Sequence, residues 1–288
     1  MLPQTASPLL VLLASLVVSS GCCVLHPQLI QPQYCNLPSD LNQPDDLQIE
    51  RGKCRPLIDG FGWVWGIPSK ITLWNRKVEN HRISIKTEST IAEYLQVNQL
   101  DEIKVRINQY RPLDDWRRLT RNKGVAWPWR YTFGTVAVLG ETVFPGRLFG
   151  GDHYNPYTGT IHLFSDVPAV ALHEAAHAKD FARRTYPGTY AAVYALPGVP
   201  LWHERIASND VLAYAELQED ANLQIEAYKV LYPAYGTYVG SAMGYVAPSI
   251  STPLYIGGVL TGHAAGRWRA TQVGPPVETL TQATPAPQ

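Results

Sequence analysis

Periodic patterns of apolar residues divide the middle of the chain into short helices and strands. Within residues 87–100, Ile91, Tyr94 and Leu95 recur at the spacing of one helix face, which predicts a helix. Residues 103–107 alternate apolar and charged side chains, which predicts a half-buried strand. Other apolar runs predict a short helix at 113–119 and strands at 61–66, at 71–74, within 131–143 and at 160–164.

A longer helix is predicted to follow the strand at 160–164. Ser165 and Asp166 supply capping side chains, and Pro168 is tolerated in a first helical turn. The Pro187-Gly188 pair ends the pattern, so the helix should span about 18 residues. Helices interspersed with strands ahead of this helix predict an α+β fold.

Residues 233–270 predict a hairpin of two apolar helices. Glycine recurs every fourth residue at 236, 240 and 244 and again at 258, 262 and 266, and prolines separate the two series. This spacing aligns glycines on one helix face and lets two backbones approach closely, as in membrane helix pairs. Each arm is short for a full membrane span. The hairpin is therefore predicted either to enter a membrane surface or to pack on the preceding domain, and it offers a route to self-association.

The two ends of the chain differ in composition from the rest. Residues 1–21 contain an apolar run followed by small residues, which predicts an export signal. The small residues before Cys22 resemble a bacterial lipobox, which implies a lipid-modified Cys22 and a membrane-anchored protein of the bacterial cell envelope. Residues 22–58 read as a tether, in which an oxidising compartment would permit a Cys35–Cys54 bridge. Residues 271–288 predict a disordered tail.

The bulk composition indicates a folded protein without a nucleic-acid partner. Hydrophobic residues make up 45% of the 288 residues and charged residues 17%, which is enough apolar material for a core. Lys and Arg number 24, and Asp and Glu also number 24, so the net charge is zero. A balanced chain lacks the basic excess that nucleic-acid binding requires.

The most informative motif is His173-Glu174-Ala175-Ala176-His177, within the predicted long helix. Residues four apart share a helix face, so His173 and His177 are predicted to hold one metal ion together. Glu174 would lie beside the ion and act as general base toward a water molecule that the metal activates. The motif therefore predicts one Zn²⁺ ion at a catalytic site.

A catalytic zinc ion usually has a third protein ligand, and two glutamates are candidates here. No further histidine follows at metzincin spacing, because Asp180 and Arg183 occupy the relevant positions. Glu204 is the favoured candidate, because it follows a proline at a helix start and precedes small residues. Glu216 is the alternative, although its polar neighbours resemble a solvated helix face. About 18 Å of helix would separate them, so both cannot bind one ion.

The HExxH motif with a downstream glutamate resembles the gluzincin group of zincin metallopeptidases, over residues 157–230. The resemblance implies a zincin-like catalytic domain, here 59–232, with an active-site helix followed by a glutamate helix. It also implies that strand 160–164 lies along the cleft edge and pairs with a peptide substrate. An oxyanion-stabilising side chain is expected, and the candidates are Tyr190, Tyr194 and His203.

Several other polar residues near the motif have weaker interpretations. Asp180 and Asp210 follow a candidate ligand at short spacing, so either would orient a histidine ring or would be a surface acid. His153 and His162 precede the motif on a loop and a strand, where histidines are more often structural than ligands.

The sequence therefore predicts a zinc-dependent metalloendopeptidase of the cell envelope. Two other hypotheses stay open. The same domain would serve as a non-catalytic zinc-binding module of an envelope lipoprotein, or the zinc site would hydrolyse a bond other than a peptide bond. An intact Glu174 favours an enzyme, because a structural zinc site has no need of it.

Overall fold

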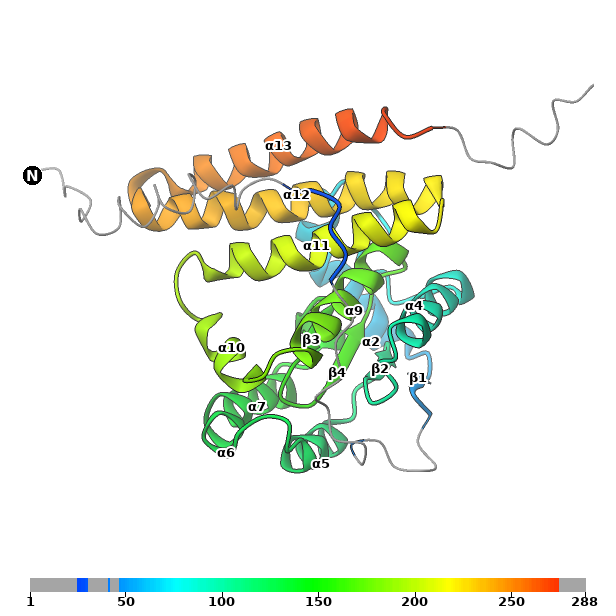
Figure 1. The fold of residues 1–288 in the computed structure, drawn as a ribbon, viewed down its shortest axis with the longest axis vertical. Coiled ribbons are helices and arrows are strands. Elements are labelled where there is room, and N and C mark those ends of the chain that lie inside the picture. Colours follow the sequence, from blue (N-terminus) through cyan, green and yellow to red (C-terminus); the bar gives the residue numbers. More distant parts are fainter. Residues whose placement is uncertain (1–24, 31–40, 42–46, 275–288) are drawn as a thin grey trace, which may run out of the picture.

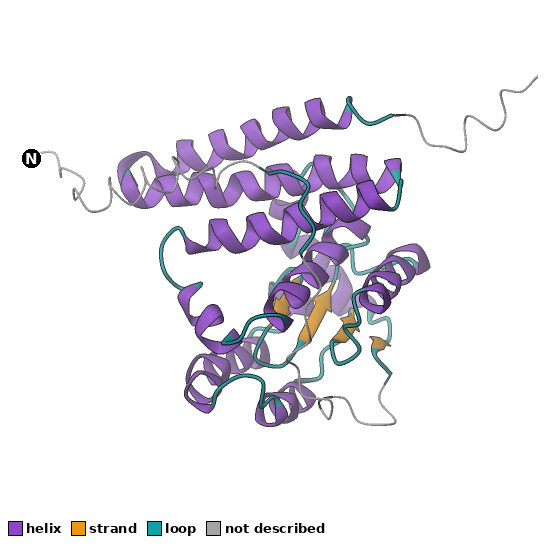
Figure 2. Cartoon of the chain, viewed as in Figure 1, coloured by secondary structure: helices purple, strands orange, loops and turns teal. Residues whose placement is uncertain are grey.

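The computed structural model describes residues 25–30, 41 and 47–274, and it has an α+β fold (Figures 1 and 2). Helices dominate, and they surround a small sheet near the middle of the molecule (Figure 2). The predicted export signal, Cys22, Cys35 and most of the predicted tail lie outside the described residues. Cys54 is exposed.

The sheet has four short strands in the order β1-β2-β4-β3. Their bounds are β1 (Ile49–Arg51), β2 (Lys104–Ile107), β3 (His153–Asn155) and β4 (Thr160–Leu163). β1, β2 and β4 are parallel, and β3 runs antiparallel to β4. The predicted strands at 103–107 and 160–164 are confirmed, but the half-buried character expected at 103–107 is wrong, because all residues of β2 and β4 are buried. Lys104 and Arg106 of β2 are buried in ion pairs with Glu50 and Asp114.

One expectation for β4 is wrong, because this strand is not at the edge of the sheet. It pairs with β2 on one side and with β3 on the other, so its backbone has no free side for a substrate. The edge strand next to it is β3, which carries His153, a residue that was predicted to lie on a loop.

Helices α9 (Pro168–Ala182) and α11 (Val199–Leu217) pack together beside the sheet, and α4 (Ile85–Val97) packs on α9 (Figure 1). The predicted helices at 87–100 and 113–119 are confirmed as α4 and as α5 (Pro112–Arg121). Fully buried alanines of α9 contact the other helices, and small side chains allow this close approach. They are Ala169, Ala171, Ala175, Ala176 and Ala178.

The long helix predicted after residue 164, α9, differs from the prediction in its N-terminal cap and in its last residue. Asp166 does not cap α9; its carboxylate instead accepts hydrogen bonds from Ser84 and Thr87 at the start of α4. The first turn of α9 is stabilised from another helix, because the Ala169 N–H donates to Glu226 at 3.1 Å. α9 ends at Ala182, and the proline expected to stop it begins α10 (Pro187–Val193).

The apolar segments predicted as strands at 61–66 and 131–143 are helical, and the segment at 71–74 ends a helix and continues as a turn. Residues 56–72 form α2 (Pro56–Trp65) and α3 (Ile67–Thr72). Residues 127–149 form α6 (Trp127–Trp129), a π-helical turn, α7 (Thr135–Val143) and α8 (Gly146–Phe149). Prolines begin α2, α3 and α6, as is usual in a first turn. Aromatic and β-branched residues suggested strands, yet many of them face outward from these helices.

The predicted C-terminal hairpin is present as α12 (Ala221–Val246) and α13 (Ser251–Ala270), joined through a short 3₁₀ turn (Pro248–Ile250). The two helices lie side by side along one edge of the molecule (Figure 1). α12 continues through Pro233, so no break separates the predicted segments 59–232 and 233–270. A Cβ on Gly262 would come within 2.6 Å of Pro233 Cα, so only glycine allows this contact.

The glycine series form the contact between α12 and α13. A Cβ on Gly236 would lie 2.2 Å from the Gly258 carbonyl oxygen, and one on Gly240 would lie 2.6 Å from the Leu254 oxygen. The inner face of α12 joins the main core through residues such as Leu231 and Tyr235. In the part of the chain that the structure describes, no helix has the length and apolar character needed to cross a membrane.

Candidate metal centre

Two helices bring three candidate ligands together. His173 and His177 lie one turn apart on α9, and Glu204 lies in the second turn of α11. α11 starts sharply, because Gly198 has a φ of 83° and Pro200 occupies the first turn. Glu204, in the turn that follows, contacts both histidines. Glu216 lies on the exposed C-terminal end of the same helix, apart from the histidines.

The distances among the three donors suit a single small cation. His173 Nε2 lies 3.1 Å from His177 Nε2 and 3.0 Å from Glu204 Oε2. His177 Nε2 lies 3.6 Å from Glu204 Oε1. Tetrahedral zinc bonds of about 2.0–2.1 Å hold neighbouring ligand atoms roughly 3.3 Å apart. Two imidazoles and one carboxylate are also a donor set of catalytic zinc, so the residues fit the metal that the motif implies.

Neighbouring hydroxyl groups orient the candidate ligands. The Ser208 hydroxyl lies 3.4 Å from His173 Nδ1, so it can accept a hydrogen bond from the Nδ1 N–H when Nε2 binds a metal ion. Tyr194 donates to Glu204 Oε1 at 2.8 Å. Tyr238 of α12 in turn hydrogen-bonds to Tyr194. Such outer contacts fix ring tautomers and carboxylate orientation around a metal.

The cluster has strongly perturbed pKa values. Burial lowers the pKa of His177, but the Glu204 carboxylate outweighs burial and raises it to about 9. Burial raises the pKa of Glu204, but the two histidines outweigh it and hold this pKa well below its usual range. The protein therefore favours a negative Glu204 facing positive charge, and a bound cation supplies the same charge.

Glu174 differs from Glu204 in its surroundings. Burial raises the pKa of its carboxyl, and the negative charges of Glu204 and Asp152 add to this rise. It is 8% exposed and lies on the wall of the cavity that also contains the three donors. Among the described residues, no side chain hydrogen-bonds to its carboxylate. Glu174 is therefore free to exchange a proton with a molecule in the cavity.

The cavity has a volume of about 500 Å³, and besides the metal cluster and Glu174 it is lined by the polar side chains of Glu79, Asp152 and His153. It is bounded by the motif helix, the loop around β3, α3 and α12. Its apolar and aromatic wall is formed by Leu73, Tyr154, Tyr157, Val170, Phe181, Val230, Leu231 and Tyr238. A concave apolar site with a few convergent polar groups is the usual form of a small-molecule or peptide-side-chain site.

The three candidate oxyanion-stabilising residues have different surroundings, and one of them lines the cavity. Tyr194 lines the cavity and contacts Glu204. Tyr190 donates instead to Asp180, which also pairs with Arg184. His203 is buried among aromatic rings, and its Nδ1 lies 3.2 Å from the Val199 carbonyl oxygen.

The two predicted orienting aspartates have partners other than the histidines. Asp180 binds the tyrosine and arginine named above, and Asp210 forms a buried ion pair with Lys179. Asp210 also accepts hydrogen bonds from Tyr94 and from the Ile30 N–H. Ser208 and Tyr238, which do surround the cluster, were not predicted in that role. Their positions depend on how the helices pack, which a single sequence does not show.

His153 and His162 do not join the motif histidines. They form a separate group with Glu141, a residue that the sequence did not single out. Glu141 lies in helix α7, within the segment 131–143 that was predicted as strands, so it was not considered as a ligand from the sequence.

Comparisons with protein-family models, with curated proteins and with solved structures find no match. A functional interpretation therefore depends on the geometry of the cluster and its cavity.

Proposed function

We propose that this protein is a zinc-dependent hydrolase whose metal is held by His173, His177 and Glu204. The observation that carries the proposal is the convergence of two Nε2 atoms and one carboxylate at mutual distances of 3.0–3.6 Å. Glu174, next to His173 in the motif, is available in the same cavity. A purely structural zinc site would not need this free carboxylate.

A zinc ion bound there would supply Lewis-acid polarisation of a carbonyl and would make water more acidic. The chain itself supplies the proton transfer. Glu174, whose pKa is raised, takes a proton from the attacking water and delivers it to the leaving group. Tyr194 donates its one hydroxyl proton to Glu204 and holds that carboxylate in place. It is the one of the three oxyanion candidates that lines the cavity, and it would have to release Glu204 before it could donate to a developing oxyanion.

The substrate is proposed to be a peptide, through a gluzincin-like arrangement. The order of elements supports it, because strand β4 leads to motif helix α9 and the glutamate helix α11 follows. Since β4 is paired on both sides, β3 is the strand available for an extended peptide. The apolar walls would accept hydrophobic side chains.

Location in the cell envelope remains part of the proposal and is supported by the sequence of residues 1–22 alone. The hairpin is proposed to act as a packed cover of the domain, since α12 contributes Val230, Leu231 and Tyr238 to the cavity wall. This arrangement leaves α13 as the outer helix (Figure 1).

Metal content tests the ligand assignment, with a matched control on the same helix. We expect wild type and Glu216→Ala to retain the same zinc content after dialysis, and Glu204→Ala to contain one zinc ion per chain fewer, by elemental analysis. The exposed Glu216 controls for the loss of a carboxylate from α11. Equal zinc retention by both variants would exclude Glu204 as a ligand. A wild-type protein that binds zinc but cleaves no member of a peptide library would favour the non-catalytic alternative.

A further inference from the structure

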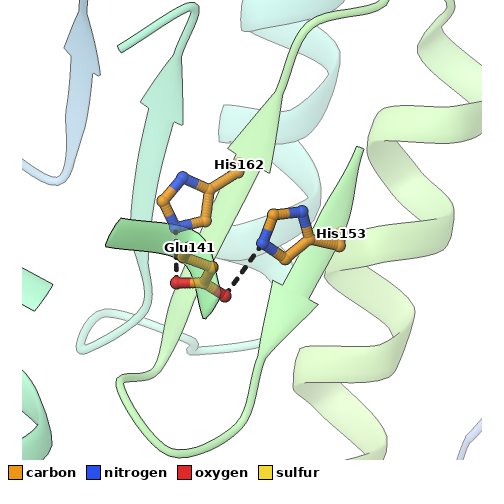
Figure 3. A group of neighbouring side chains, drawn as sticks. All are labelled: Glu141, His153 and His162. Atoms are coloured by element: carbon orange, nitrogen blue, oxygen red, sulfur yellow. Dashed lines mark hydrogen bonds and ion pairs between the residues drawn. The ribbon is translucent and has the colours of Figure 1, made fainter. Parts of the chain in front are cut away.

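A second group of metal-binding side chains lies across the β3–β4 strand pair. His153 on β3 and His162 on β4 are directly opposite each other in the antiparallel register. Glu141 of α7 reaches the same face of the sheet, and its two oxygens point toward the two rings (Figure 3). The rings are stacked, with centroids 4.7 Å apart. Backbone pairing therefore fixes the relative position of the two histidines.

The hydrogen bonds around the group direct donor atoms toward one point. His153 Nδ1 lies 2.9 Å from the Gly151 carbonyl oxygen, which can only accept, so Nδ1 carries a proton. His153 Nε2 then faces Glu141 Oε1 at 3.1 Å. The Asn155 amide donates to the same oxygen at 2.8 Å and holds the carboxylate in place. A carbonyl behind the distal nitrogen is the usual support of a metal-binding histidine.

In the described part of the chain, two buried atoms of the group have no hydrogen-bond partner. His162 is 6% exposed, and its Nε2 is unpaired. It points toward Glu141 Oε2, which is also buried and unpaired, across a distance of 4.0 Å (Figure 3). Buried polar atoms are nearly always paired, so two such atoms facing each other indicate a missing partner.

We propose that Glu141, His153 and His162 form a second metal site, for Zn²⁺ or a similar first-row transition metal. Two imidazoles and one carboxylate suit these ions better than Ca²⁺ or Mg²⁺, which prefer oxygen ligands. The three ligand atoms lie within 4.8 Å of one another, so small side-chain rotations bring them to bonding distance of one ion. The ion would bind His162 Nε2 and Glu141 Oε2, the two atoms that lack a hydrogen-bond partner.

A proton shared between His153 and Glu141 explains less of the arrangement. A doubly protonated His153 would satisfy Glu141 Oε1, yet His162 Nε2 and Glu141 Oε2 would stay unpaired. The second ion would join β3, β4 and α7. His153 lines the cavity that contains Glu174, so the ion would also add positive charge at the wall of that cavity.

Zinc stoichiometry tests this site separately from the HExxH site. Apo-protein is equilibrated with Zn²⁺ at a few times the protein concentration, dialysed and measured by elemental analysis. We expect two ions in wild type, one in His173→Gln/His177→Gln, and none when Glu141→Gln is added to that pair. His153→Gln repeats the test at a partly exposed position, and His263→Gln, far from both groups in sequence, is the control. Circular dichroism checks that each variant is folded.

The outcomes distinguish the two sites. One ion retained in His173→Gln/His177→Gln and lost with Glu141→Gln or His153→Gln supports the second site, even if the HExxH site proves inactive. A folded His173→Gln/His177→Gln protein that retains no zinc overturns it. So does retention that neither Glu141→Gln nor His153→Gln reduces. Zinc should also raise the melting temperature of the His173→Gln/His177→Gln protein, and Glu141→Gln should abolish that rise.

Discussion

The buried ion pair between Lys179 and Asp210 offers a sharp test of how the metal helices are held together. Lys179 lies on α9 with the two histidines, and Asp210 lies on α11 with Glu204. The ammonium contacts both Asp210 oxygens, at 2.9 and 3.3 Å. Asp210 is fully buried, and Lys179 is 8% exposed. Replacing Asp210 with Asn keeps the side-chain volume and removes the counter-charge of Lys179.

The distance between the two charges gives the size of the expected loss of folding stability. At 2.9 Å and an effective dielectric constant of about 20, the pair gains about 6 kcal/mol of Coulomb energy. Much of this gain offsets the desolvation of the two charges, but removing one partner leaves the other charge buried and costs about 3–5 kcal/mol. We predict that Asp210→Asn lowers the free energy of unfolding by about 3 kcal/mol, or the melting temperature by about 6–12 °C.

Urea unfolding of metal-free protein at pH 7, followed by circular dichroism, measures this loss without a contribution from zinc binding. The double variant Lys179→Met/Asp210→Asn removes both charges, so it should recover at least about 1 kcal/mol relative to Asp210→Asn. A loss below about 1 kcal/mol in the single variant would refute the reasoning. A double variant whose loss equals the sum of the two single losses would also refute it.

Three further predictions concern packing, acid stability and ligand orientation. Gly258→Ala should destabilise the protein by about 1–3 kcal/mol, because its Cβ would lie 2.3 Å from the backbone of α12. Gly257→Ala is the control, because a Cβ there meets no atom within 4 Å, and it should be neutral or slightly stabilising. Similar melting temperatures of the two variants would contradict this prediction. Burial raises the pKa of Glu50, but hydrogen bonds from a lysine and an arginine outweigh it and lower the pKa to about 2. Because the folded-state pKa of Glu50 is depressed, Glu50→Gln should lower the free energy of unfolding most above about pH 5. The difference in this free energy between variant and wild type should shrink toward about pH 2. A difference in urea unfolding that does not change with pH would contradict this. Tyr194→Phe should weaken zinc binding about 10-fold in competition with a chelator, because Glu204 loses its hydrogen bond, and unchanged affinity would count against that role.

Local patterns predicted those elements whose apolar period matches the side that is buried. The helix at 87–100 buries Ile91, Tyr94 and Leu95 in the core, so it was predictable. The strand at 103–107 was also predicted, but its alternation did not report its burial, because Lys104 and Arg106 are buried as well. The strand predictions for 61–66, 71–74 and 131–143 were wrong for the opposite reason. Their aromatic and β-branched residues are common in strands, but here many of them face outward on helices that have a proline in the first turn.

The site was predictable only as far as one helix determines it. The spacing of His173 and His177 fixes their common face before any folding is considered. The choice between Glu204 and Glu216 depends on which turn of α11 meets α9, and the group of Glu141 with two strand histidines depends on three separate elements. Asp166 shows the same limit, because its capping bonds go to α4 across the fold instead of to the adjacent helix.

Glu174→Gln tests the central claim most directly, because it keeps the shape of the side chain and removes its ability to accept a proton. Zinc content and the rate of peptide-library cleavage are measured together on wild type and variant. The hydrolase account predicts unchanged zinc content and a rate at least about 100-fold lower. A variant that retains full zinc and cleaves at the wild-type rate would contradict the account.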